Sequence, residues 1–280
     1  MEFYKYHSLG NDYLVYDIRK NREELDQEKI VRICSRNFGI GSDGIVAGPY
    51  EKEGEILVRV FNPDGTEAEQ GGNALRIFAH YLKTTGDIQK ETFSLCTKSG
   101  ISQIRYLNRE GNRIQMTMGK LNFSSRNLGL SGPDREAVHE FYNFGGEECD
   151  CTCVSSGNPH CVIVLEKTDR ETVCRIGKYS ERAECFPEGI NTEIVEILDK
   201  NNIQIEIFER GAGYTLASAT GACAAAGAAY RRGLIDSDVM VHMPGGKLWT
   251  QIDEEWAVKT IGSVKRICKI QLFEDFFQGI

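Results

Sequence analysis

Two stretches decide the fold of this chain: EAEQGGNALR at residues 67–76 and TLASATGACA at residues 215–224. Each is a turn of small residues that runs directly into an apolar helix, which leaves the first backbone N–H groups of the helix unpaired. With the positive end of the helix dipole, these donors form a site for a carboxylate or a phosphate. The residue before each anion site can touch the bound molecule, and these residues are Gly71 and Ser218. Glycine supplies no acid or base, so Gly71 and Ser218 do not form the matched pair of reacting groups that two such sites would be expected to carry.

The composition is that of a globular protein with one large domain or two of ordinary size. The chain has 280 residues, of which 41% are hydrophobic and 26% charged. Its net charge of −8 argues against nucleic acid and against an anionic membrane as partners. No apolar run approaches the roughly 18 residues of a membrane span, and residues 1–5 open on a strand rather than on a signal peptide. We therefore expect a cytoplasmic protein.

The ten cysteines follow no regular framework. Cys149, Cys151 and Cys153 alternate and are expected to share one face of a strand, but they lack a fourth ligand at a familiar spacing, so we expect no metal site. The other cysteines that lie in apolar runs are expected to be reduced core thiols: Cys34, Cys96, Cys161, Cys174, Cys185, Cys223 and Cys268.

Hydrophobic periodicity predicts an α+β fold built from two similar halves. In the first half it predicts strands within residues 5–17 (with a turn at 9–12) and over 55–61, 91–95 and 113–118, with helices over 26–36 and 73–83. In the second half it predicts strands over residues 161–166, 194–198, 203–208, 239–243 and 247–252, with helices over 170–179 and 221–231. A final strand over 266–272 is expected to pair back with the first half.

The predicted helices are too few for a doubly wound parallel sheet, so each half is expected to be a mixed, mostly antiparallel sheet around a central helix. The polar segment 119–132 marks the junction. We therefore divide the chain into an N-terminal half, residues 1–118 with 265–280, and a C-terminal half, residues 119–264. Two halves that present equivalent reacting groups suit a reaction in which a substrate is approached from two opposite faces.

Five segments in order carry a resemblance to a known family. They are HSLGNDY (7–13), FNPDGTE with QGGN (61–67 and 70–73), GNPH (157–160), FPEGIN (186–191) and ERGAG (209–213). Together they resemble the diaminopimelate epimerases over nearly the whole chain. The resemblance implies an epimerase or racemase that inverts an α-carbon without pyridoxal phosphate, metal or any other cofactor. It also implies a homodimer that binds an amino acid such as diaminopimelate in a cleft between the halves, with a place in lysine biosynthesis.

The resemblance also implies the roles of particular residues. Gly72 and Asn73 from one half, and Ala219 and Thr220 from the other, are expected to hold the α-carboxylate. Six more residues are expected to hold the distal ammonium and carboxylate of the substrate: Asn11, Asn62, Asn158, Asn191, Glu209 and Arg210.

The departures from the family's pattern lie where the chemistry is expected. Two facing cysteines that exchange the α-proton in the family align with Gly71 and Ser218. Ala74 and Ala219 replace glycines, and Tyr214 replaces a glutamate. Other cysteines are not expected to take over: Cys161 and Cys223 fall at positions where family members carry non-catalytic cysteines.

Three functions stay open at this point. In an epimerase with an altered acid–base set, Gly71 would leave space for His160 to act directly or through water, and Glu209 would activate Ser218; alternatively, His160 only orients its loop. In a one-base isomerase, the single group would be Ser218, Tyr214, Glu69 or His160. In a binding or regulatory homologue, the ligand site is kept and catalysis is lost.

Overall fold

The structure is a computed structural model that describes residues 1–52, 54–68 and 71–278, and it divides into two compact units. One unit comprises Met1–Met116 and Gly262–Ile280, and the other comprises Thr117–Ile261. The chain leaves the first unit within β7 (Arg113–Lys120) and returns to it within β16 (Ala257–Ser263). These divisions lie a few residues before the predicted ones at 118/119 and 264/265.

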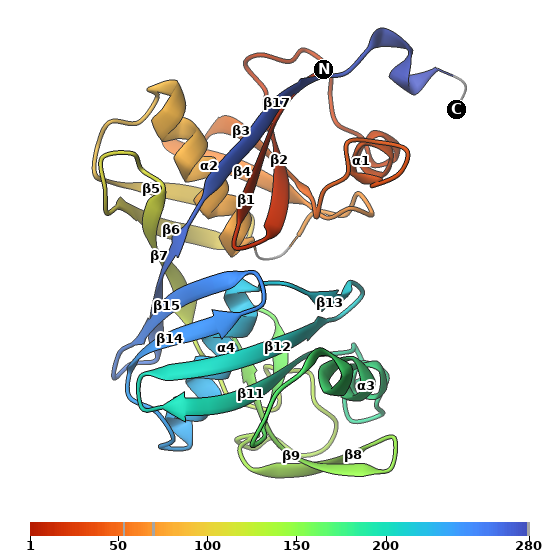
Figure 1. Ribbon diagram of the computed structural model, residues 1–280, viewed down its shortest axis with the longest axis vertical. Helices are drawn as coiled ribbons and strands as arrows, with labels where there is room; N and C mark the ends of the chain where they lie inside the picture. The colour runs from red at the N-terminus through yellow and green to blue at the C-terminus, as the bar shows by residue number, and fades with distance from the viewer. Residues whose placement is uncertain (53, 69–70, 279–280) are drawn as a thin grey trace. The chain divides into compact units, whose positions relative to one another are not determined.

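The first unit is a mixed sheet with two helical crossovers (Figure 1). Strand pairing runs in the order β17–β1–β2–β3–β4–β5–β6–β7, and only the β2–β3 and β4–β5 pairs are parallel among those described. Helix α1 connects the first parallel pair and α2 the second, as parallel neighbours require. The elements not yet given bounds are β1 (Glu2–Ser8), β2 (Asn11–Asp17), α1 (Gln27–Cys34), β3 (Ile45–Lys52), β4 (Glu55–Phe61), α2 (Gly72–Thr85), β5 (Thr92–Thr97), β6 (Gly100–Tyr106), β17 (Lys265–Gln271) and the 3₁₀ turn Glu274–Phe277.

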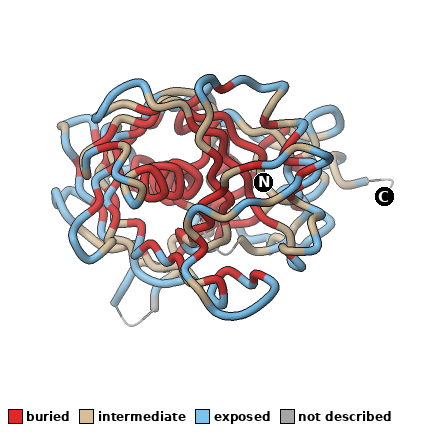
Figure 2. The backbone as a smooth tube through the Cα atoms, turned by 90° about the horizontal axis from the view of Figure 1, so that it is seen from below, coloured by how far each residue is buried: buried red, intermediate tan, exposed pale blue. Residues whose placement is uncertain are grey.

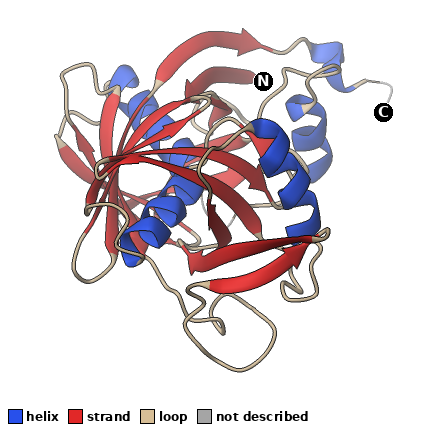
Figure 3. Cartoon of the chain, turned by 60° about the horizontal axis from the view of Figure 1, so that its bottom comes forward, coloured by secondary structure: helices blue, strands red, loops and turns tan. Residues whose placement is uncertain are grey.

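The second unit repeats this plan. Figure 3 distinguishes the helices, strands and loops of the chain by colour. Pairing runs in the order β8–β9–β10–β11–β12–β14–β15–β16, and the parallel pairs are β10–β11 and β12–β14, at the same two places in the order. Helices α3 and α4 make the two crossovers. The bounds are β8 (Glu140–Phe144), β9 (Glu147–Ser155), β10 (Pro159–Val164), α3 (Arg170–Ser180), β11 (Asn191–Asp199), β12 (Asn202–Glu209), β13 (Gly213–Thr215), α4 (Ala219–Arg231), β14 (Asp238–Met243) and β15 (Gly246–Ile252). The prediction of two similar α+β halves is confirmed.

Each unit has a central helix that is buried along most of its length. Helix α2 is buried from Gly72 to Leu82, and α4 from Ala219 to Ala229 (Figure 2). Helix α4 consists mainly of alanine and glycine, which lets other backbone and side chains approach closely: a Cβ atom at Gly227 would lie 2.3 Å from Leu121 Cδ1. A helix that is apolar all round is expected in a protein core.

Of the seven cysteines expected in the core, Cys34, Cys161 and Cys223 are buried, whereas Cys96, Cys174 and Cys185 are only partly buried. Cys149, Cys151 and Cys153 lie on one buried face of β9, and no described cysteine forms a disulfide. Cys268, expected in the core, is exposed. It lies on β17, which pairs with β1 and carries exposed side chains from Lys265 to Lys269. The predicted pairing of this final strand with the first half is confirmed.

No helix in the described ranges is long and apolar enough to cross a membrane.

Candidate active site

The start of α4 carries the first of the predicted reacting groups. Ser218 is the N-cap residue, and its Oγ accepts a hydrogen bond of 3.2 Å from the Gly221 N–H. The cap therefore satisfies one of the helix's first donors, and the role of the N–H groups at Ala219 and Thr220 in holding an anion stays a prediction. Thr220 adds a hydroxyl 3.3 Å from Ser218 Oγ.

Glu209, the last residue of β12, supplies a carboxyl group beside Ser218. Burial raises the pKa of the Glu209 carboxyl, and the neighbouring Glu193 carboxylate raises it further. A hydrogen bond from the Ser218 side chain and the charge of His160 offset this rise only in part. A carboxylate with a raised pKa is a stronger base than an exposed one, so this pair can accept and return a proton.

His160 lies at the centre of a buried polar chain. Its Nδ1 is 2.8 Å from Glu193 Oε1, and its Nε2 is 2.8 Å from Asn158 Oδ1. The side chains of His160 and Glu193 are both 0% exposed. Both ring nitrogens are thus engaged within the protein, which favours the orienting role for His160 over a direct contact with a substrate.

Asn191 and Arg210 connect the segments around this site. The Asn191 side chain donates to the Pro159 carbonyl at 2.7 Å and accepts from the Arg210 N–H at 3.0 Å. The Arg210 guanidinium donates to the Glu188 carbonyl at 3.0 Å. The second unit therefore brings together the predicted residues of three sequence motifs, 157–160, 186–191 and 209–213.

Tyr214 lies on the other face of the sheet. It pairs with Phe208, which packs against α3, and its hydroxyl donates to Glu206 at 2.8 Å. The Arg170 guanidinium lies 4.5 Å from the centre of its ring. Because successive strand residues face opposite ways, Glu209 faces the α4 side instead. Tyr214 is thus separated from Ser218, and the geometry removes it as the single group of a one-base isomerase. Glu69, another candidate, lies outside the described residues.

In the first unit, Gly71 precedes α2 as its N-cap residue, with φ −151° and no side-chain cap. A Cβ atom at this position would lie 3.0 Å from Val60 Cγ2 and 3.1 Å from Val60 Cγ1. These distances are tighter than an ordinary van der Waals contact. The sequence predicted an open space at Gly71, and this is corrected where a Cβ atom would lie. The Val60 side chain, from β4, already occupies that space.

The helix start in the first unit is held by a chain of amides and charges. Asn73 donates to Asn11 Oδ1 at 3.1 Å, and Asn11 donates to Asp43 Oδ2 at 2.9 Å. From below, Arg76 donates to Asn73 Oδ1 at 2.7 Å, although its side chain is 0% exposed. The structure thus joins Asn11 and Asn73, two predicted ligand residues, by a hydrogen bond. It also places the buried Arg76 guanidinium next to Asn73, where the carboxylate site is predicted.

Asn62 lies outside this chain of contacts. It belongs to the turn after β4, where its side chain donates to Thr66 Oγ1 at 3.0 Å.

Sequence reasoning missed Glu193 and Arg76. For Arg76 the signal was a charged residue inside the apolar stretch 74–79, whereas Glu193 lies in a segment, 190–197, where apolar and polar residues are equally common and Glu196 follows, so no signal marked it.

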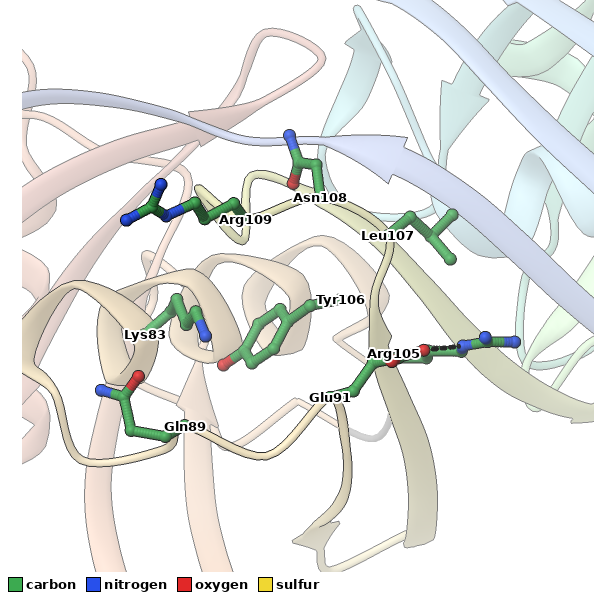
Figure 4. Close-up of a pocket in the computed structure, with 8 residues that line it drawn as sticks. All are labelled: Lys83, Gln89, Glu91, Arg105, Tyr106, Leu107, Asn108 and Arg109. Atoms are coloured by element: carbon green, nitrogen blue, oxygen red, sulfur yellow. Dashed lines mark hydrogen bonds and ion pairs between the residues drawn. The ribbon is translucent and has the colours of Figure 1, made fainter.

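A separate surface pocket in the first unit is unrelated to these residues (Figure 4). Basic side chains of Lys83, Arg105 and Arg109 line it, together with Glu91 and Tyr106. Arg105 is already paired with Glu91 at 2.6 Å, and Lys83 Nζ lies 5.1 Å from the centre of the Tyr106 ring. The pocket contains none of the predicted site residues.

Comparison with solved structures shows the fold. The chain is similar to a probable proline racemase from Agrobacterium radiobacter K84, with a TM-score of 0.73, 12% identity, and coverage of 99% of this chain and 94% of that one. It is also similar to a phenazine biosynthesis protein of the PhzF family from Bacillus anthracis, with a TM-score of 0.71, 14% identity, and coverage of 98% and 99%.

Comparison of sequences shows the family. The model of the family described as diaminopimelate epimerase matches residues 3–124 and 152–267. The chain is 43% identical over 279 residues to diaminopimelate epimerase 2 of Nostoc sp., covering 99% of this chain and 97% of that protein. It is 35% identical over 260 residues to the diaminopimelate epimerase of Moorella thermoacetica, with coverage of 90% and 93%. The chain therefore belongs to the diaminopimelate epimerase family.

Proposed function

We propose that this protein binds an amino acid of the diaminopimelate class and, as a cofactor-independent epimerase with an altered acid–base pair, exchanges the α-proton mainly from one face. One observation carries the proposal: the half-buried Glu209 carboxyl, with its raised pKa, lies beside Ser218 at the start of α4. A serine hydroxyl alone is too weak a base to remove an α-proton. The carboxylate supplies the missing basicity.

The proton moves between the α-carbon and Glu209, directly or through the Ser218 hydroxyl. As the C–H bond breaks, its electron pair spreads into the α-carboxylate, and the proton is taken up by the Glu209 carboxylate. The N–H groups at the start of α4 stabilise the charge that grows on the carboxylate oxygens. Return of the proton, or of a deuteron from solvent, completes the exchange.

The start of α2 in the first unit carries no reacting group, and Arg76 and Asn11 orient the Asn73 side chain there. That Gly72 and Asn73 hold a carboxylate stays a prediction from the family's pattern. Gly71 offers no acid or base, and Val60 lies in the direction of the missing side chain. A positioned acid or base is worth roughly 10²–10⁴ in rate, so inversion is slower than exchange by about that factor.

A second candidate is a binding protein without turnover. It is favoured by the lack of an acid or base at Gly71. It is also favoured by the hydrogen bond that Ser218 Oγ accepts from the Gly221 N–H, because this bond gives Ser218 a structural role as a helix cap. The ligand residues of the family, Asn158, Asn191 and Arg210 among them, are kept in either case.

Deuterium incorporation at the α-carbon of diaminopimelate, followed by NMR in D2O, tests the proposal. We expect incorporation by the natural protein and its loss in Glu209→Gln. Glu206→Gln is the matched control, because Glu206 is a β12 carboxyl with a raised pKa that faces α3 instead. Calorimetric binding of diaminopimelate with no incorporation would support the binding protein, and absence of both would contradict the ligand class.

We also infer a cytoplasmic homodimer in lysine biosynthesis. The described cysteines form no disulfide, which fits a reducing compartment. Dimerisation and the pathway rest on the family alone. Sedimentation of the purified protein tests the first, and complementation of a diaminopimelate epimerase deletion strain tests the second.

A further inference from the structure

We propose that the surface pocket of the first unit binds a phosphate monoester of a small organic molecule, with Lys83 and Arg109 as the residues that hold the phosphate group (Figure 4). The pocket lies between the last turn of α2, the segment 89–91 and the turn that follows β6. None of the residues assigned to the candidate active site lines it. The proposal therefore adds a second binding site, and it does not depend on the proposed function.

The pocket carries an excess of positive charge. Three basic side chains and one acidic side chain line it, in a chain whose net charge is −8. The acidic one, Glu91, is already bonded, because Arg105 Nε donates to Glu91 Oε1 at 2.6 Å. Among the described residues, Lys83 and Arg109 form no ion pair with a carboxylate, and Glu110 does not line the pocket. Two positive charges are therefore left for an anion.

Lys83 is held in place by packing rather than by an acid. A Cβ atom at Gly111 would lie 2.5 Å from Lys83 Cγ and 3.3 Å from Tyr106 Cδ1, so glycine, here with φ +64°, lets the Lys83 stem approach the turn beside the ring. The ring is itself fixed, because the Tyr106 hydroxyl donates to the Ala79 carbonyl at 2.6 Å. Lys83 Nζ lies over this ring, 5.1 Å from its centre. A contact with a ring face uses no hydrogen-bond acceptor, so the N–H donors of the ammonium group stay available to phosphate oxygens.

Arg109 lies in a turn that is closed by hydrogen bonds. Asn108 Oδ1 accepts from the backbone N–H groups of Asn112 and Arg113, each at 3.2 Å. These bonds fix the backbone that carries Arg109, whose exposed side chain is left without a partner among the described residues. The helix dipole favours a cation in the last turn of α2 and so accounts for Lys83, but Arg109 lies outside any helix. The second cation at this pocket is therefore the stronger indication of a ligand.

Two cations from different elements suit a phosphate monoester better than a carboxylate. A phosphate monoester carries about −1.5 to −2 charges at pH 7 and has three terminal oxygens. An ammonium group meets such an anion as a point charge, and a guanidinium group can bind two of its oxygens at once. The pocket has a volume of about 380 Å³, within the range of small-molecule sites. Leu107, which is 36% exposed, offers an apolar surface to the organic part of the ligand.

Titration of ¹⁵N-labelled protein with ribose 5-phosphate, followed by NMR, tests the site. We expect saturable shifts in the amide signals of residues 83–91 and 105–111, and weaker binding of ribose and of inorganic phosphate. Absence of saturable shifts in these two segments would overturn the proposal. Equally tight binding of ribose would remove the phosphate group from recognition, and equally tight binding of inorganic phosphate would remove the organic group, so either result contradicts the proposed class of ligand.

Variants at two positions test the assigned residues. Lys83→Met keeps the apolar stem and removes the charge, and it should weaken ribose 5-phosphate binding about tenfold, the effect of one hydrogen bond to a charged group. Arg109→Gln should weaken it about fivefold, since the Arg109 side chain is exposed. Unchanged binding in both variants would contradict the assignment. If Lys83→Met fails to fold, Arg109→Gln still decides, because it changes an exposed side chain on a turn.

Lys90→Gln is the matched control. Lys90 is an exposed lysine in the neighbouring segment that does not line the pocket, so this variant should bind ribose 5-phosphate as the natural protein does. A loss equal to that of Lys83→Met would show that only the overall charge matters, and it would contradict the site. No amino acid enters these measurements, so their failure is distinguishable from a failure of the proposed function.

Discussion

Introducing a side chain at Gly71 tests how far this chain has departed from an arrangement with two reacting side chains. In Gly71→Cys, the new Cβ atom would lie 3.0 and 3.1 Å from the two Cγ atoms of Val60 and 3.4 Å from its Cβ. Val60 is 3% exposed and belongs to β4, so it has little freedom to move. The variant is therefore expected to lose stability, and the loss should depend on Val60.

The size of the effect follows from the packing. Overfilling a packed site costs about 1–3 kcal/mol. Gly71 has φ −151° and ψ 52°, outside the common extended and helical regions, so a larger residue gains no stability here through the unfolded chain. We expect Gly71→Cys to lose about 1–3 kcal/mol. Val60→Ala alone should cost about 2 kcal/mol, from two buried methyl groups and a small cavity. In the double variant the new side chain fills that space, and the two effects should offset each other by about 1–2 kcal/mol.

A double-mutant cycle measures this coupling. Both tryptophans, Trp249 and Trp256, lie in the second unit, so fluorescence would report on the wrong part of the chain. Hydrogen exchange of the α2 and β4 amides, with circular dichroism during urea unfolding, reports on the first unit. Gly71→Ala is the matched control and should show the same coupling, because the close contact begins at Cβ. Additive effects within about 0.5 kcal/mol would refute the reasoning.

Three further predictions address the remaining parts of the site. Because the pKa of Glu209 in the folded protein is raised above the ordinary 4.5, the rate of deuterium exchange should fall as the pH drops through that raised pKa. The free energy of unfolding should decrease as the pH rises from 4.5 through the same pKa, because folding favours the protonated carboxyl. Glu209→Gln should remove both pH dependences, which are measured by rate profiles and by melting at different pH values. Gly221→Ala should push the Glu193 carboxylate from its place and lower the free energy of unfolding by about 1–3 kcal/mol, whereas an unchanged melting temperature would show that the contact relaxes freely. Arg76→Met should cost about 1.5–3 kcal/mol and weaken diaminopimelate binding measured by calorimetry, because Asn73 loses a charged donor; unchanged affinity would leave Arg76 a purely structural role.

Local patterns predicted most elements of the fold. Alternation from 55 to 61 gave β4 with its observed bounds, and the helix after Gly71 followed from residue types alone. β3 was missed because Gly48 and Pro49 lie in its middle, where they usually indicate a turn. The structure accommodates them with an irregularity between Ala47 and Tyr50 in the pairing with β4.

The site could be predicted only where its chemistry is carried by short motifs. Asn73, Asn158 and Ser218 each belong to a turn or a helix start that is visible in the sequence. The contacts that decide what these residues do come from elsewhere in the chain. Val60 meets Gly71 through packing between β4 and α2, and Glu193 meets His160 across two paired strands. Such tertiary contacts leave no local pattern.

The ratio of exchange to inversion at the α-carbon tests the central claim most directly. Stereochemically pure L,L-diaminopimelate is incubated with the protein in D2O, and deuterium content and conversion to the meso form are followed in the same sample. A protein that works from one face, through Glu209 and Ser218, is predicted to incorporate deuterium roughly 10²–10⁴ times faster than it inverts the centre. Inversion at the same rate as exchange, or no exchange above that of Glu209→Gln, would contradict the account.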